Sequence, residues 1–329
     1  MRLRHVLQLT AVLLLALSQA TAANYYRGFI GEEPWQLELS IDGNAVRGRL
    51  THDYLPLQLE AGGSFDSNDN SIVARFGLTE GELIGTMLGE PDPFGKFQGT
   101  FLTAGGIEQF SFEQVAVYVD YSFNQDLIQA TSTYPFFTSP RLQELNNHVQ
   151  PDLMAEQIQF VQMAQAAGVN GDILHGWWFD SRATIEYAAP GLLSSLVTVS
   201  DYTGGPHASL NYWSYNLALT GTRLRPFDLG DLFLPDSPWL QVLGELVLAD
   251  LHGQGADWIV DDTITEVTET DLQVFVLGPV GLQFVLAPYQ VGPWSSGSFT
   301  VSIPLEELDG LLDPEGPIRL LWREGAAAD

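Results

Sequence analysis

The chain has 329 residues, no cysteine, and 41 acidic against 13 basic side chains, which gives a formal net charge of −28. This charge excludes a nucleic-acid partner, because phosphate binding needs clustered cations, and it disfavours direct docking to an anionic membrane. Without cysteine the chain forms no disulfide, so its stability must come from its hydrophobic core. The length is sufficient for such a core and fits two domains.

The first 22 residues have the pattern of an export signal. Arg2 and Arg4 make a basic start, residues 6–17 are mostly apolar, and Ala20-Thr21-Ala22 is a small-x-small cleavage site. The apolar run is shorter than the about 20 residues that a membrane span needs; the alternative is an N-terminal anchor helix. We expect cleavage near Ala22 and a periplasmic or secreted mature chain with no membrane span. Loss of the two arginines would bring its net charge to −30.

Residues 23–119 are predicted to form an antiparallel β meander, either a barrel or a sandwich. Short apolar segments alternate with turns rich in Gly, Asn and Asp, as in all-β domains. The clearest is segment 35–41, whose polar and apolar residues alternate and which ends at the hairpin signal Asp42-Gly43. Asp66–Ser71 lacks the glycine and glutamate of an EF-hand calcium loop, so we expect a polar hairpin loop there.

Residues 134–322 are predicted to form an α+β domain with a mostly antiparallel sheet and a few helices. Apolar residues at helical spacing predict a helix over 140–167, kinked at Pro151. A second helix is expected from Ser237-Pro238 to about His252. The expected strands are 177–187, 192–200, 211–220, 272–277, 282–286 and 299–303.

Two turns in this second domain are the most distinctive motifs of the chain. Tyr202–His207 is a glycine turn that ends in a histidine, and Pro288–Pro293 is a tyrosine turn bracketed by prolines. Together with Asp228–Phe233, they resemble the extracytoplasmic domain of unknown function found in the ectodomain of a lysozyme-sensing anti-sigma factor and beside the catalytic domain of some peptidoglycan deacetylases. In that family a β-rich module often precedes the domain. The resemblance implies a domain and an extracytoplasmic compartment, and it implies no reaction.

The candidate binding residues lie in and beside these two turns. Gly204 and Gly205 can adopt a positive φ that other residues resist. His207 either donates to a ligand or ties the turn to a neighbouring strand. An exposed groove lined by some of the aromatic residues would favour binding, although such residues also form core. The candidates are Tyr202, Gly204, Gly205, His207, Tyr289 and Trp294, and the groove could also include Trp177, Trp178 and Trp213.

The residues predict no catalytic, metal or cofactor site. The chain has no cysteine and no Gly-x-Ser-x-Gly elbow, and its histidines form no closely spaced pair. We therefore expect a non-catalytic exported cell-envelope protein that binds or senses a glycan or a cationic protein such as a lysozyme-like enzyme. The alternatives are a periplasmic hydrolase that acts on cell-wall material with an unrecognised carboxylate or histidine site, and a structural or assembly factor. The acidic charge fits either simple solubility or attraction to a cationic partner.

Overall fold

The computed structural model describes residues 23–321 apart from residues 54, 56, 79–80, 141, 148, 170–175, 190, 221–222 and 279–280. The predicted export signal lies outside the described residues. None of the helices within them is long and apolar enough to cross a membrane.

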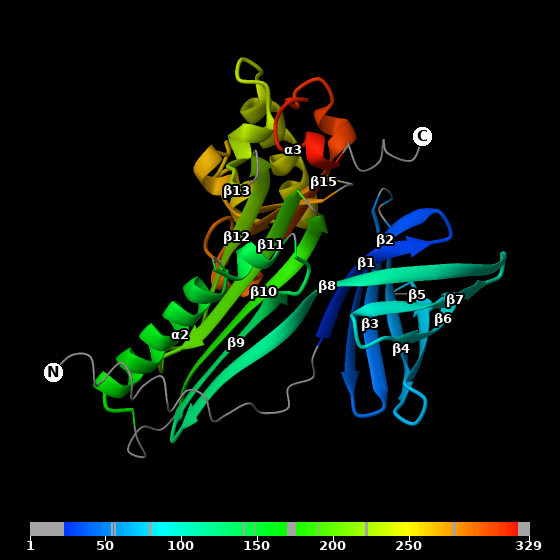
Figure 1. The fold of residues 1–329 in the computed structure, drawn as a ribbon. Helices are drawn as coiled ribbons and strands as arrows, with labels where there is room; N and C mark the ends of the chain where they lie inside the picture. Colours follow the sequence, from blue (N-terminus) through cyan, green and yellow to red (C-terminus); the bar gives the residue numbers. More distant parts are fainter. Residues whose placement is uncertain are drawn as a thin grey trace.

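Eight antiparallel strands form a closed barrel in the N-terminal part of the chain (Figure 1). Each strand pairs with the next, and β1 also pairs with β8, which closes the barrel. The predicted meander is confirmed, and the barrel is the form it takes. The polar loop predicted at residues 66–71 joins two of its strands. The strands are β1 (Ala23–Ile30), β2 (Glu33–Asp42), β3 (Ala45–His52), β4 (Gln58–Asp66), β5 (Ser71–Gly77), β6 (Leu83–Pro91), β7 (Lys96–Thr103) and β8 (Gly106–Gln125).

The interior of the barrel is a core of alternate side chains. Successive residues of a strand point to opposite faces, so every second residue faces inward. Bulky side chains fill the space, and those that are almost completely buried include Leu37, Leu50, Phe76, Met87, Phe97 and Phe112. The barrel is therefore packed through its middle.

Strand β8 belongs to the barrel and to a second sheet. Its last part, residues 116–125, pairs with β9 (Ile128–Phe137), which the sequence analysis did not predict. The residues between the two predicted domains, 120–133, therefore lie mostly in strands. The division into a domain of residues 23–119 and one of residues 134–322 stays a prediction.

The second sheet continues from β9 through β10 (Trp177–Ala189), β11 (Leu192–Tyr202), β12 (Ser209–Thr220) and β13 (Arg223–Pro226). β9 and β10 are parallel, whereas the other neighbours are antiparallel. A parallel pair needs a crossover, and here it contains the short 3-10 helix η2 (Gln143–Asn147) and α2 (Val149–Ala166). The sheet is mostly antiparallel, as predicted.

Helix α2 begins later than the sequence predicts. The expected helix over 140–167 is divided into η2 and α2, and Pro151 lies in the first turn of α2. The first N–H groups of a helix have no partner within it, so proline costs little there. Pro151 is therefore compatible with the start of a helix and does not kink its middle.

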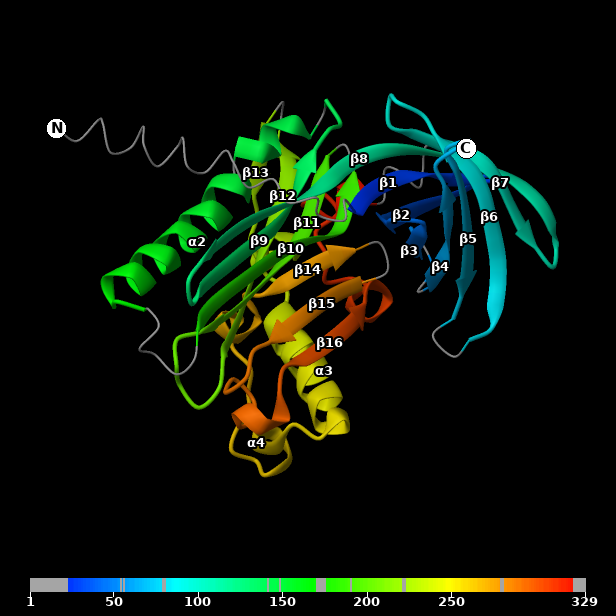
Figure 2. The ribbon, with the colours of Figure 1, turned by 90° about the horizontal axis from the view of Figure 1, so that it is seen from below.

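Two layers cover the two sides of the second sheet (Figure 2). On one side α2 packs on β9 and β10. On the other side lie α3 (Trp239–Gln254) and the sheet of β14 (Phe275–Gly278), β15 (Gly281–Leu286) and β16 (Phe299–Pro304). These elements confirm the predicted second helix and the last three predicted strands. The shorter helices are η3 (Leu229–Leu232), α4 (Asp257–Val260), η4 (Glu269–Leu272), η5 (Trp294–Ser296) and η6 (Leu305–Leu308).

Candidate binding site

The two distinctive turns of the sequence are in contact in the structure. The first connects β11 with β12, and the second lies in the segment between β15 and β16. The imidazole of His207 stacks on the indole of Trp294, with ring centroids 4.2 Å apart and ring planes 12° apart. Nε2 of the same histidine lies 3.3 Å from the hydroxyl of Tyr289, a residue 82 positions away in the chain. We call His207, Tyr289 and Trp294 the aromatic cluster.

Backbone and side-chain contacts of the second turn present Tyr289 to solvent. Tyr289 has φ 70°, the left-handed conformation that is uncommon for a residue other than glycine. Gln290 holds the turn, because its backbone N–H donates to the carbonyl of Ala287 and its side-chain carbonyl accepts from the Ala287 N–H. Its side-chain N–H also donates to the backbone carbonyl of Asp271. The tyrosine side chain is 56% exposed, so its ring can meet a ligand.

The other three candidate residues lie in the first turn. Tyr202 stacks on Trp178, with ring centroids 6.4 Å apart. Gly204 has φ +94°, the positive φ that the sequence suggests for this glycine pair, whereas the φ of Gly205 is not positive. Gly205 is an exposed turn residue beside it. The structure thus divides the candidates into the aromatic cluster and a Trp178–Tyr202 pair at the end of the sheet.

Two serines that follow Trp294 in the chain, Ser296 and Ser298, bond to side chains of other elements. Ser296 donates a hydrogen bond to the carboxylate of Asp257, at the start of α4. The hydroxyl of Tyr212 lies 2.9 Å from that of Ser298. An aromatic face beside a carboxylate is suited to a cationic group. It is not the arrangement of a serine hydrolase, because the serine bonds directly to the aspartate and His207 Nε2 faces a phenol.

The remaining tryptophans of the expected groove do not share one surface. Trp177 and Trp213 pack against the core between α2 and the sheet. Trp178 lies on the opposite side of the sheet, because neighbouring residues of a strand alternate. The sequence shows these residues to be on strands, but their assignment to core or surface depends on which side α2 covers.

A second polar cluster, at the junction of the barrel and the second sheet, was not found from the sequence. Arg27 and Asp53 form an ion pair of 2.8 Å, and the carboxylate of Asp53 is fully buried. Arg27 also donates to the hydroxyl of Tyr187 on β10, 160 residues away. No sequence motif identifies partners this far apart. Because it ties β1 to β10, we assign this cluster a structural role.

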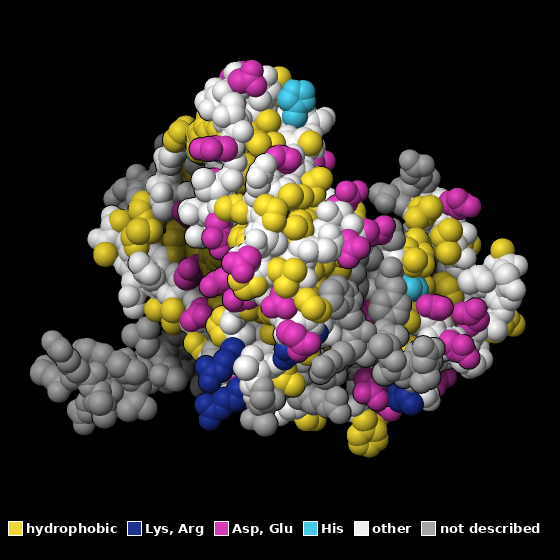
Figure 3. Space-filling view, turned by 90° about the horizontal axis from the view of Figure 1, so that it is seen from above, with side chains coloured by type: hydrophobic (Ala, Val, Ile, Leu, Met, Phe, Trp, Pro, Cys, Tyr) yellow, Lys and Arg dark blue, Asp and Glu magenta, His cyan; other side chains and the backbone are white. Residues whose placement is uncertain are grey.

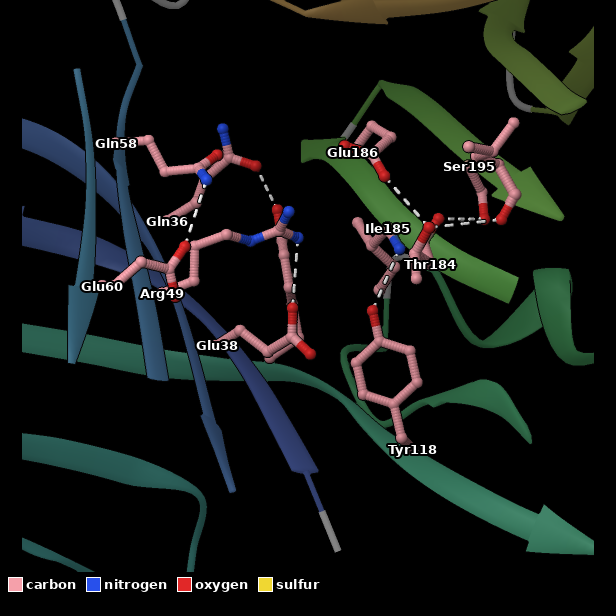
Figure 4. A network of polar contacts seen from close by, with 12 residues as sticks. Gln36, Glu38, Arg49, Gln58, Glu60, Tyr118, Thr184, Ile185, Glu186 and Ser195 are labelled. Atoms are coloured by element: carbon pink, nitrogen blue, oxygen red, sulfur yellow. Dashed lines mark hydrogen bonds and ion pairs between the residues drawn. The ribbon is translucent and has the colours of Figure 1, made fainter. Parts of the chain in front are cut away.

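Figure 4 shows the neighbouring part of this junction. Arg49 pairs with Glu38 at 3.1 Å on the barrel side. From β8, the hydroxyl of Tyr118 accepts a hydrogen bond from the backbone N–H of Ile185 on β10. Burial raises the pKa of the Tyr118 hydroxyl, so this phenol stays neutral. A cavity of about 50 Å³ is lined by Glu38, Arg49 and Ile185 among others, and it has room for water and not for a larger ligand.

Comparisons with known proteins identify a domain without a known activity. Residues 230–306 match a family model described as "Protein of unknown function (DUF3298)", and this stretch includes Tyr289 and Trp294. No curated protein matches the chain. A solved structure of a DUF3298 family member from Bacteroides fragilis is 16% identical, with 62% of this chain and 94% of that chain covered and a TM-score of 0.37. A DUF3298 family protein from Pseudomonas aeruginosa is 14% identical, with 68% and 96% covered and a TM-score of 0.43.

Proposed function

We propose that this chain is a non-catalytic, exported cell-envelope protein that binds a cationic protein, such as a lysozyme-like enzyme, through the aromatic cluster. The observation that carries the proposal is the exposed ring of Tyr289 beside the stacked His207–Trp294 pair, with the carboxylate of Asp257 nearby. A lysine or arginine side chain can contact such rings by its cationic group and pair with the carboxylate.

The charge of the whole chain supports the same partner. The net charge of −28 attracts any cationic protein over a long range and speeds its encounter. In Figure 3 acidic side chains are spread over the visible face, whereas Lys and Arg occupy few places. Such attraction is not specific by itself. Specificity requires a local contact, which the aromatic cluster supplies. The resemblance to a lysozyme-sensing ectodomain supports this assignment.

Calorimetry of the mature chain tests the proposal. Lysozyme and an unrelated protein of similar positive charge are compared at physiological ionic strength, where the screening length is about 8 Å. We expect lysozyme to bind more tightly than the unrelated protein. Because central aromatic contacts dominate interfaces, Tyr289→Ala and Trp294→Ala should each weaken its binding at least ~10-fold.

The matched control is Phe94→Ala, which removes an aromatic ring that is 94% exposed on the barrel. This variant should bind lysozyme as tightly as the unchanged chain does, since Phe94 lies in the barrel, between β6 and β7, and not in the second sheet. Equal affinity for both cationic proteins, or no binding of either, would reject the proposal and leave solubility as the role of the charge.

A further inference from the structure

The side of the β8–β12 sheet opposite α2 carries three rows of side chains. The strand registers place residues of neighbouring strands directly beside one another. Residues 179, 183, 197 and 199 pack toward α2, so the alternate residues point the other way. We call the three rows the polar sheet face. They are Tyr212, Thr198, Arg182, Thr133 and Asp120; Leu210, Ser200, Asp180, Thr131 and Ser122; and Tyr202, Trp178, Gln129 and Asn124.

This face is open to solvent. All residues of the polar sheet face are half-buried or exposed. The β14–β16 sheet covers only the far part of the same side, where Ser194 accepts from the backbone N–H of Leu277 and Asn216 donates to the carbonyl of Phe275. The contact of Tyr212 with Ser298 lies at the boundary between the part of the sheet that the β14–β16 sheet covers and the part that is open. The polar sheet face therefore borders the β14–β16 sheet, and it spans about 19 Å across five strands.

The side chains of the face suit a sugar better than a protein. Protein interfaces have an apolar core, but Leu210 is the one aliphatic side chain in the three rows. Threonine and serine hydroxyls can both donate and accept hydrogen bonds, as sugar hydroxyls do. At one end Trp178 and Tyr202 stack with their planes 23° apart. Such rings can pack against the apolar side of a sugar ring while polar groups fix its orientation.

The charges of the face exclude an acidic glycan. Asp120 and Asp180 contribute two negative charges against the one positive charge of Arg182. They lie in a chain whose net charge is −28, which repels an acidic polymer within the screening length. Neutral sugars avoid this repulsion, and amine-bearing sugars gain attraction from the same carboxylates.

We propose that the polar sheet face binds a linear glycan chain without acidic groups. One sugar ring packs on the Trp178–Tyr202 pair, and its neighbours bond to Asp180, Arg182 and the threonines along the rows. The three rows include none of the three residues of the aromatic cluster, and the proposal does not depend on the binding of a cationic protein.

The test is calorimetry of the mature chain with three linear hexasaccharides, which are the hexamers of N-acetylglucosamine, of glucosamine and of galacturonic acid. We expect at least one of the first two to bind and the acidic hexamer not to bind. Trp178→Ala and Asp180→Ala should each weaken binding at least ~10-fold, because each removes a central contact. Comparison of the first two hexamers shows whether the amine or the uncharged ring is recognised.

Two controls keep the outcomes distinct. Tyr289→Ala, in the aromatic cluster, should leave glycan binding within about 2-fold, since this tyrosine lies outside the rows. The side chain of Asp180 is exposed, so Asp180→Ala should unfold at no lower a temperature than the unchanged chain, which would exclude misfolding as the cause of weaker binding. The proposal is overturned if neither non-acidic hexamer binds, if the acidic hexamer binds equally well, or if both face variants bind normally.

Discussion

At the residue scale, two adjacent glycines of β4, Gly62 and Gly63, show two different reasons for glycine in a strand. One position has no space for a side chain, and the other does. A Cβ atom added to Gly63 would lie 1.9 Å from the carbonyl oxygen of Val73 on the paired strand, whereas one added to Gly62 would have no atom within 4 Å. Real Cβ contacts are never so short, so Gly63 permits the close approach of β4 and β5. This explains why a small barrel needs glycine inside its strands.

We therefore expect Gly63→Ala to lower the free energy of unfolding by about 2 kcal/mol, because the backbone must move to accept the methyl group. Gly62→Ala should leave stability unchanged or raise it by about 0.5 kcal/mol, since alanine is favoured over glycine within a strand. Urea unfolding of both variants measures the difference. Equal losses of stability would show that the space around Gly63 is not limiting.

The contacts of the candidate residues could be predicted from the sequence only in part. Glycine and proline mark the two turns, and the family resemblance links them, so their importance is readable. The stacking of His207 on Trp294 depends on how two distant turns meet, and spacing cannot show that. The contact of Ser296 with Asp257 joins residues 39 positions apart, and it was found only from the structure.

At the element scale, the missed strand β9 shows where hydrophobic patterning fails. The residues of β9 that face α2 are Ile128, Ala130, Ser132 and Tyr134, and two of these four are small. The residues that face the other side include the threonines of the polar sheet face. The two sides of β9 therefore differ little in hydrophobicity, and the sequence of the segment resembles that of a linker. The barrel strands and β10–β12 alternate more strongly, which explains why they could be predicted.

Strand β9 also determines which C-terminal fragment can fold alone. It pairs with residues 116–125 of β8, and Val115, Ala116 and Tyr118 belong to a core cluster with Phe137. We expect a fragment of residues 114–321 to fold and a fragment of residues 134–321 to remain unfolded, because the shorter one loses both the strand pairing and this core. Far-UV circular dichroism and thermal unfolding of the two fragments test this. A cooperative transition of the shorter fragment would contradict it.

At the scale of the whole molecule, the excess of carboxylates makes stability depend on pH. The net charge of −28 favours solubility but destabilises the compact state by repulsion. Partial burial also raises the pKa of Glu156, Asp180 and Asp201. A carboxyl whose pKa is higher in the folded state binds protons more readily there. Folding therefore becomes more favourable as pH falls through the raised pKa, and this contribution is lost as pH rises.

We accordingly expect the urea midpoint of unfolding to be higher at pH 5 than at pH 7 in low salt. Two carboxyls act in the opposite direction, because hydrogen bonds from Ser71 and Thr263 lower the pKa of Asp69 and Asp261. Their contribution is lost only as pH falls below the ordinary carboxyl pKa of about 4, so it does not oppose the gain between pH 7 and pH 5. Added salt screens the repulsion and should raise the midpoint at pH 7 more than at pH 5. A midpoint that falls between pH 7 and pH 5 would show that neither repulsion nor carboxylate burial governs the stability of this protein.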